Sequence, residues 1–146
     1  MDRKYIAEFL GTFSLVFTGC GAIIVNDVFN GVVGHIGICI VFGLIVMAMI
    51  YVFRDLSGAH INPAVTVALF FSGRFHGRLV IPYIISQLIG AILAAVVLNY
   101  TFPSHETLGS TISVVPLHSA FIIEVIISFL LMYVVFGISE NEQDSR

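Results

Sequence analysis

Charged residues are scarce in this chain: they make up 10% of its 146 residues, and only six are lysine or arginine. That scarcity excludes the basic surface with which proteins bind nucleic acid. Tryptophan is absent, and cysteine occurs only at Cys20 and Cys39, each inside an apolar stretch. Such cysteines indicate small apolar side chains rather than a disulfide or a metal pair. We therefore expect no nucleic-acid partner, no metal and no cofactor.

Hydrophobic residues are abundant instead. They make up 58% of the chain, and its mean hydropathy is +1.04. A soluble domain of this composition could not cover its surface with polar groups. Crossing a bilayer takes about 20 apolar residues. Four stretches are long enough, and they predict membrane spans over about 5–25, 35–53, 82–102 and 118–138.

The first stretch has a rival interpretation as a signal peptide, because Arg3 and Lys4 form a basic start. Glu8 would interrupt the apolar core of a signal peptide, and the apolar stretch continues past Cys20. We therefore interpret the first stretch as a membrane span that is retained.

The basic residues predict the orientation in the membrane. The connections 26–34 and 101–117 contain no lysine or arginine, so alternating spans place all six basic residues on one side. That side faces the cytoplasm in most membrane proteins. The sequence therefore predicts a multi-pass protein of the plasma (inner) membrane with both termini in the cytoplasm.

The segment between the second and third spans predicts a half-helix. Residues 64–72 are apolar but only nine in number, which corresponds to about 13–14 Å of helix, roughly half the hydrocarbon thickness. This length is too short to span and too apolar for a cytoplasmic loop. Irregular backbone at membrane depth is tolerated only against protein or a water-filled cavity. The segment therefore indicates a cavity near the middle of the membrane.

The residues before this half-helix carry a specific chemistry. Pro63 suits the first helical position, and Asn62 then occupies the N-cap. The positive end of the helix dipole and the amide donor of Asn62 together would orient water and repel cations. The alternative is a capped helix at the membrane surface with no role in a pore.

Two stretches carry a resemblance to a known family. The sequence Ser-Gly-Ala-His-Ile-Asn-Pro-Ala-Val-Thr at 57–66 resembles the first signature loop of the aquaporin (major intrinsic protein) family, and Ala-Glu-Phe-Leu-Gly-Thr-Phe at 7–13 resembles that family's first helix. The resemblance covers essentially the whole chain. It implies a pore lined by the carbonyl groups of Gly58, Ala59 and His60 and by the Asn62 side chain, with Pro63 and Ala64 as the structural motif. The His60 ring could also brace the loop.

The resemblance implies roles for three further residues. Phe42 matches the second-helix position of the narrow filter, where phenylalanine is typical of water-selective members and tryptophan of glycerol facilitators. The alternative is a packing or lipid-facing side chain. Glu8 and Glu124 lie inside spans, where a carboxylate must find hydrogen-bond donors. The matching glutamates of the family bond the two signature loops, although Glu8 could instead reach water at the membrane edge.

An internal similarity supports this interpretation. Glu8 precedes Phe13 by five residues and Glu124 precedes Phe129 by five, and three spans separate the two copies. An odd number of spans per repeat produces the inverted repeats found in many transport proteins.

The family has six spans and two signature loops, whereas this chain shows four spans and one loop. The resemblance therefore predicts the N-terminal portion of an aquaporin-like channel domain over 1–138, followed by a cytoplasmic loop or a truncated end at 139–146. The expected fold class is an all-α membrane protein: an incomplete aquaporin-like helical bundle of four transmembrane helices and one re-entrant half-helix. The resemblance also implies a homotetramer for the full-length protein.

Three functions remain open. The first is a fragment of a passive water channel, non-conducting by itself, and the second is a channel for glycerol or another small neutral solute. The third is a four-span structural membrane protein, although the connections at 26–34 and 101–117 are short and lack cysteine. An enzyme is not expected, because the spans hold no Ser/His/Asp set or metal cluster. The expected partners are the lipid bilayer and water or a small neutral solute.

Overall fold

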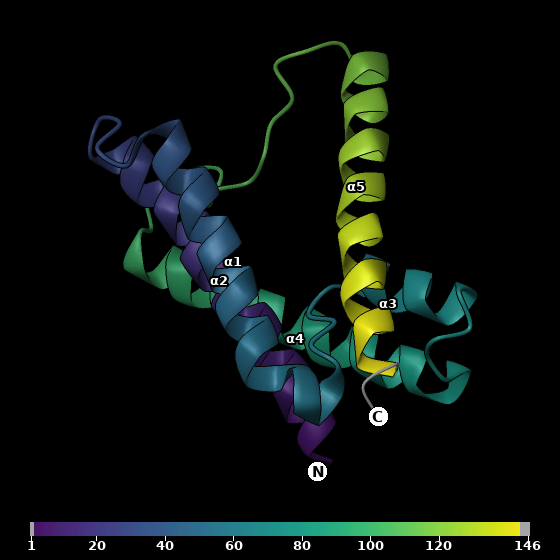
Figure 1. Ribbon diagram of the computed structural model, residues 1–146. Coiled ribbons are helices and arrows are strands. Elements are labelled where there is room, and N and C mark those ends of the chain that lie inside the picture. Colours follow the sequence, from purple (N-terminus) through teal and green to yellow (C-terminus); the bar gives the residue numbers. More distant parts are fainter. Residues whose placement is uncertain (1, 144–146) are drawn as a thin grey trace. The chain divides into compact units, whose positions relative to one another are not determined.

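The computed structural model describes residues 2–143, which are helical apart from the connections (Figure 1). The helices are α1 (Arg3–Val28), α2 (Gly34–Ser57), α3 (Pro63–Phe71), α4 (Gly77–Thr101) and α5 (Leu117–Gln143). They divide between two compact units, with α1 to α4 before Ser110 and α5 after it. No strand occurs within residues 2–143, so this part of the chain is all-α as predicted.

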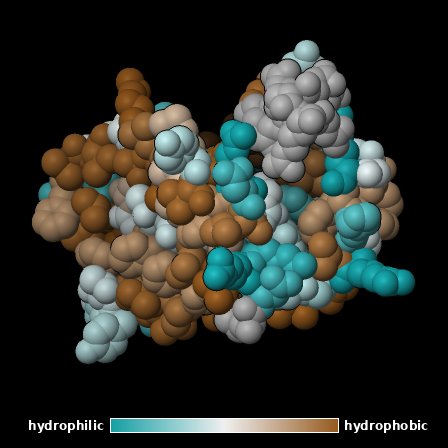
Figure 2. All heavy atoms as spheres, turned by 60° about the horizontal axis from the view of Figure 1, so that its bottom comes forward, coloured by the Kyte–Doolittle hydropathy of each residue, from teal (hydrophilic) through white to brown (hydrophobic). Residues whose placement is uncertain are grey.

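Within residues 2–143, four helices are long enough and apolar enough to cross a membrane: Arg3–Val28, Gly34–Ser57, Gly77–Thr101 and Leu117–Gly137. The remaining helix, α3, has nine residues and cannot span. Large apolar side chains are exposed along α2, α4 and α5. Figure 2 shows hydrophobic residues over much of the visible face, with hydrophilic residues in smaller groups. Lipid, rather than water, is the solvent that such surfaces require.

Helix α1 is the centre of the first unit, since it contacts both α2 and α4, while α3 contacts α4. Small residues allow these close contacts. A Cβ atom at Gly90 of α4 would meet the Phe9 carbonyl oxygen and would lie 3.1 Å from the Phe13 backbone nitrogen. Gly19 of α1 has the ring of Phe42 directly against it. Close backbone approach at small residues is the usual way in which membrane helices pack.

We expect alanine at Gly90 to destabilise the contact between α1 and α4. The added methyl group would press on backbone atoms of α1, which cannot rotate away, and overpacking of this kind costs about 1–3 kcal/mol. Gly43→Ala is the matched control, because among the described residues nothing beyond the adjacent chain and backbone of its own helix lies within 4 Å of a Cβ at that position. Thermal unfolding in detergent, followed by circular dichroism, should show a lower midpoint for Gly90→Ala only. Equal midpoints for the wild type and Gly90→Ala would contradict the close approach.

Candidate functional site

The loop between α2 and α3 has an unusual backbone. Helix α2 ends at Ser57, and its C-cap Gly58 has a φ of 85°, in the left-handed region that glycine adopts at low cost. Ala59 and Ile61 also have positive φ values, of 49° and 42°. Each such non-glycine residue costs about 1–2 kcal/mol. The loop therefore needs strong contacts to hold this conformation.

Helix α3 begins as its sequence indicates. Pro63 is the first helical residue, and Asn62 is the N-cap, with a φ of −155°. The Asn62 Oδ1 atom accepts a hydrogen bond of 2.8 Å from the Ala64 backbone N–H. This bond uses one of the two lone pairs of the amide oxygen, and the side-chain NH₂, which can only donate, takes no part in it.

Glu8 of α1 holds the loop in place. Its carboxylate is fully buried and accepts four hydrogen bonds. Oε1 accepts from Ser57 Oγ (2.6 Å) and from the His60 backbone N–H (3.0 Å). Oε2 accepts from the Ile61 backbone N–H and from Gln87 Nε2, both at 2.7 Å. A buried carboxylate needs such donors, and these bonds offset the backbone cost of the loop.

Gln87 and Thr66 extend this network to α4 and α3. Because the Glu8 carboxylate only accepts, the Gln87 atom facing it must be Nε2, which also donates to Thr66 Oγ1 at 3.0 Å. The Thr66 hydroxyl in turn donates to the Asn62 carbonyl oxygen at 3.1 Å. Thr66 and Gln87 are both fully buried. Four elements of the chain are therefore bonded together around the residue that caps α3.

The His60 side chain is buried among aromatic rings. Its ring centroid lies 4.5 Å from that of Phe75 and 5.1 Å from that of Tyr83, and its Nδ1 lies 3.1 Å from Thr66 Oγ1. Since the Thr66 proton goes to Asn62, we assign the proton of this contact to His60 Nδ1. The Tyr83 hydroxyl donates to the Ser57 carbonyl oxygen at 2.9 Å and braces the end of α2.

The family to which this architecture belongs is shown by sequence comparison. The profile of the family described as Major intrinsic protein matches residues 1–146, the whole chain. The chain belongs to this family. Together with its four apolar helices, membership makes it an integral membrane protein. The family prediction and the fold class, an incomplete aquaporin-like helical bundle, are both confirmed.

Individual relatives agree with this assignment. The probable NIP-type aquaporin of Nicotiana alata is 43% identical over 142 residues, which cover 97% of this chain and 52% of the relative. Aquaporin NIP1-1 of Arabidopsis thaliana is 42% identical, with 97% and 50% covered. Aquaporin Z of Photorhabdus laumondii is 40% identical, with 97% and 67% covered. The chain thus spans about half the length of most of these major intrinsic proteins, whose family comprises membrane channels rather than enzymes.

The other residues singled out from the sequence have different surroundings. The Phe42 ring is half-buried and lies against Gly19, so one of its edges packs on α1. Gly58 and Ala64 are exposed, the Ala59 side chain is buried, and Asn62 is half-buried. The Glu124 side chain is exposed on α5, in the second unit. Its contact with a signature loop stays a prediction.

Sequence reasoning missed four members of the network: Ser57, Thr66, Tyr83 and Gln87. One signal was available for Gln87. It is an uncharged amide in the middle of a span of mean hydropathy 2.2, where a polar side chain must have a partner. Ser57 and Thr66 lie at the two ends of the signature stretch, and nothing in the spacing of Tyr83 distinguishes it from a packing aromatic residue.

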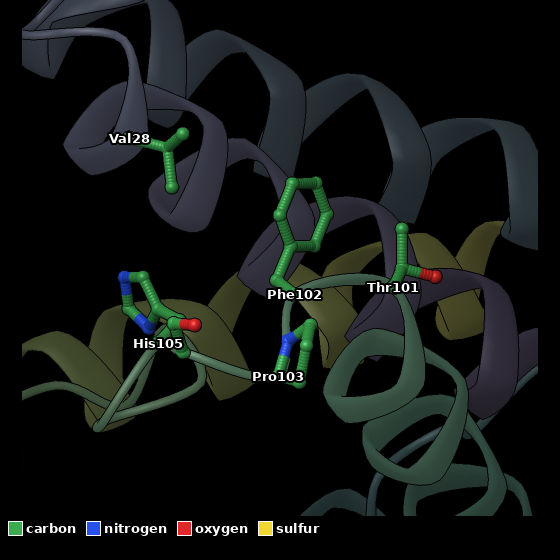
Figure 3. A pocket seen from close by; sticks show the side chains of 6 residues that line it. Val28, Thr101, Phe102, Pro103 and His105 are labelled. Atoms are coloured by element: carbon green, nitrogen blue, oxygen red, sulfur yellow. The ribbon is translucent and has the colours of Figure 1, made fainter.

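A separate hollow of about 300 Å³ lies at the end of α1 away from Glu8 (Figure 3). It is lined by the end of α1, the end of α4 and the residues that follow: Val28, Thr101, Phe102, Pro103, Ser104 and His105. The hollow contains none of the residues that resemble the pore motif. His105, which lines this hollow, also contacts Asp27 near the end of α1.

Proposed function

We propose that this chain forms the N-terminal part of a passive channel for water, and that the pore passes the N-terminus of α3. The observation that supports the proposal is a nine-residue half-helix, capped by Asn62 and held by a buried carboxylate. A structural protein has no need of a capped half-helix joined to three other elements by a buried polar network.

The mechanism follows from the groups at the cap. The Asn62 Oδ1 atom accepts from the Ala64 N–H, and the NH₂ group of the side chain supplies donors to a passing molecule. The N-terminus of α3 adds a partial positive charge. A water molecule here would turn its oxygen toward the cap, which interrupts a proton-conducting chain of waters, and cations would be repelled. The carbonyl groups of Gly58, Ala59 and His60 would supply acceptors along the approach.

A channel for glycerol or another small neutral solute is the second candidate. Phe42 bears on this choice, because a phenyl ring narrows a pore without donating hydrogen bonds, and its ring is anchored on Gly19. Two of the relatives are named as NIP-type aquaporins and one as aquaporin Z, and these names do not decide between water and other solutes. We favour water on the basis of Phe42.

We also propose that both termini face the cytoplasm, that the membrane is the plasma (inner) membrane and that the full-length protein is a homotetramer. The distribution of the six basic residues supports the orientation. The family resemblance supports the tetramer. We propose no enzymatic activity and no cofactor.

A chimaera tests the channel proposal. Residues 1–146 replace the matching part of the Nicotiana alata relative, and proteoliposomes are assayed for water permeability, glycerol uptake and proton leak. We expect water permeability well above that of empty liposomes and little glycerol uptake.

Asn62→Asp should lower water permeability at least several-fold or open a proton leak, because a carboxylate replaces the neutral donor. Asn30→Asp, in the exposed connection after α1, is the matched control. Normal water flux and proton exclusion in Asn62→Asp would remove Asn62 from the pore, and glycerol uptake would favour the second candidate.

A further inference from the structure

The His105 ring connects the segment 102–110 to the end of α1. Its Nε2 atom lies 3.3 Å from Asp27 Oδ2, and its Nδ1 accepts a 3.0 Å hydrogen bond from the Leu108 backbone N–H. The His105 side chain is only 11% exposed, and Figure 3 shows it beside the hollow with Val28 and Phe102. A neutral imidazole has one donor and one acceptor nitrogen. Leu108 requires the acceptor at Nδ1, so Nε2 donates to the Asp27 carboxylate.

The segment held by this ring folds back onto α1. Leu108 and Gly109 have φ values of 48° and 73°, and Gly109 is buried. A Cβ at Gly109 would lie 2.6 Å from the Cys20 carbonyl oxygen and 3.0 Å from its Cα. Cys20 lies eight residues before the end of α1, which corresponds to about 12 Å of helix. The segment therefore packs on the side of α1 rather than standing away from it.

We propose that His105 is a proton-sensitive clamp for this segment. A proton taken up from solvent binds at Nδ1, because Nδ1 is the ring nitrogen that carries no hydrogen. Nδ1–H then faces Leu108 N–H, so two donors oppose each other and the hydrogen bond between them is lost. Nε2–H still donates to Asp27, now as an ion pair. The ring stays at the end of α1 while the turn at Leu108 and Gly109 is released from Cys20.

The charged groups around the ring are consistent with this response. Asp27 is the titratable group on the α1 side, and Glu106 is exposed within the segment itself. Histidine is the side chain whose ordinary charge change lies between about pH 5 and 8. The clamp does not depend on the proposed function.

A spin label at the exposed Thr107 tests the clamp. The 146-residue chain carries Thr107→Cys with Cys20→Ser and Cys39→Ser, in lipid nanodiscs. We expect the immobilised component of the spectrum at pH 8 to be lost as the pH falls to 5. His105→Gln should keep the immobilised component at every pH, because its amide accepts from Leu108 and donates to Asp27 without titrating. His105→Ala should show the mobile spectrum throughout.

Two outcomes would overturn the proposal: a wild-type spectrum that does not change between pH 8 and 5, or a His105→Gln variant that changes as the wild type does. Asp27→Asn adds an independent measurement. Loss of the carboxylate that pairs with the protonated ring should move the transition to lower pH, and an unmoved transition would show that Asp27 does not take part. A label at the exposed Tyr51 of α2 controls for general effects of acid. None of these measurements involves water flux, so the channel proposal can fail while the clamp holds.

Discussion

Replacing Glu8 with glutamine is expected to release the loop before α3. The carboxylate accepts from Ser57 Oγ, the backbone N–H groups of His60 and Ile61, and Gln87 Nε2. Glutamine presents an NH₂ group to one pair of these donors, so at least one buried backbone N–H, that of His60 or of Ile61, loses its acceptor. Each unsatisfied donor costs about 1–3 kcal/mol, and breaking a buried charged site costs about 3–5 kcal/mol.

Hydrogen–deuterium exchange of the stretch 57–66 in nanodiscs measures this effect. A loss of about 3 kcal/mol corresponds to exchange roughly 100-fold faster at the His60 and Ile61 amides. Glu106→Gln is the matched control, because Glu106 is exposed in a connection. Equal protection of the loop in the wild type and in Glu8→Gln would show that Glu8 does not brace it. That result would favour the alternative in which Glu8 reaches water at the membrane edge.

The 146-residue chain by itself is expected to leave the water permeability of liposomes at background. Its half-helix has nine residues, about 13–14 Å, and reaches only about halfway through the hydrocarbon. In the family a second half-helix meets the first and closes the pore wall. Without it, polar groups at the Asn62 end of α3 would face lipid or an ill-formed cavity, at several kcal/mol each.

Association of two copies is not expected to repair the wall. Parallel copies would present their half-helices from the same side, and an inverted copy would place its basic residues on the wrong side. Stopped-flow shrinkage of liposomes that contain the purified chain provides the measurement, with the chimaera described above as the conducting control. Permeability clearly above empty liposomes, with a low activation energy, would show that this chain forms a pore on its own.

The sequence by itself determined the architecture of the chain. Four apolar stretches gave four helices of spanning length, because backbone groups in lipid must be satisfied within the segment and hydropathy alone reports such segments. The start of α3 was also predictable: the Asn62 side chain caps the N–H of Ala64, and Pro63 fits the first helical position, so local chemistry was sufficient. Helix α3 runs over Pro63–Phe71, within one residue at each end of the expected 64–72.

Only the tertiary structure decided which donors bond the Glu8 carboxylate. A glutamate in a span must find donors, but hydropathy does not say which ones, and the donors to Glu8 lie 49 to 79 residues away in the chain. The positive φ values of Ala59 and Ile61 follow from those bonds, since neither residue favours that conformation by itself. The contact of the Phe42 ring with Gly19 and that of His105 with Asp27 could not be predicted from the sequence for the same reason. Each contact joins helices or connections whose separate patterns contain no information about their neighbour.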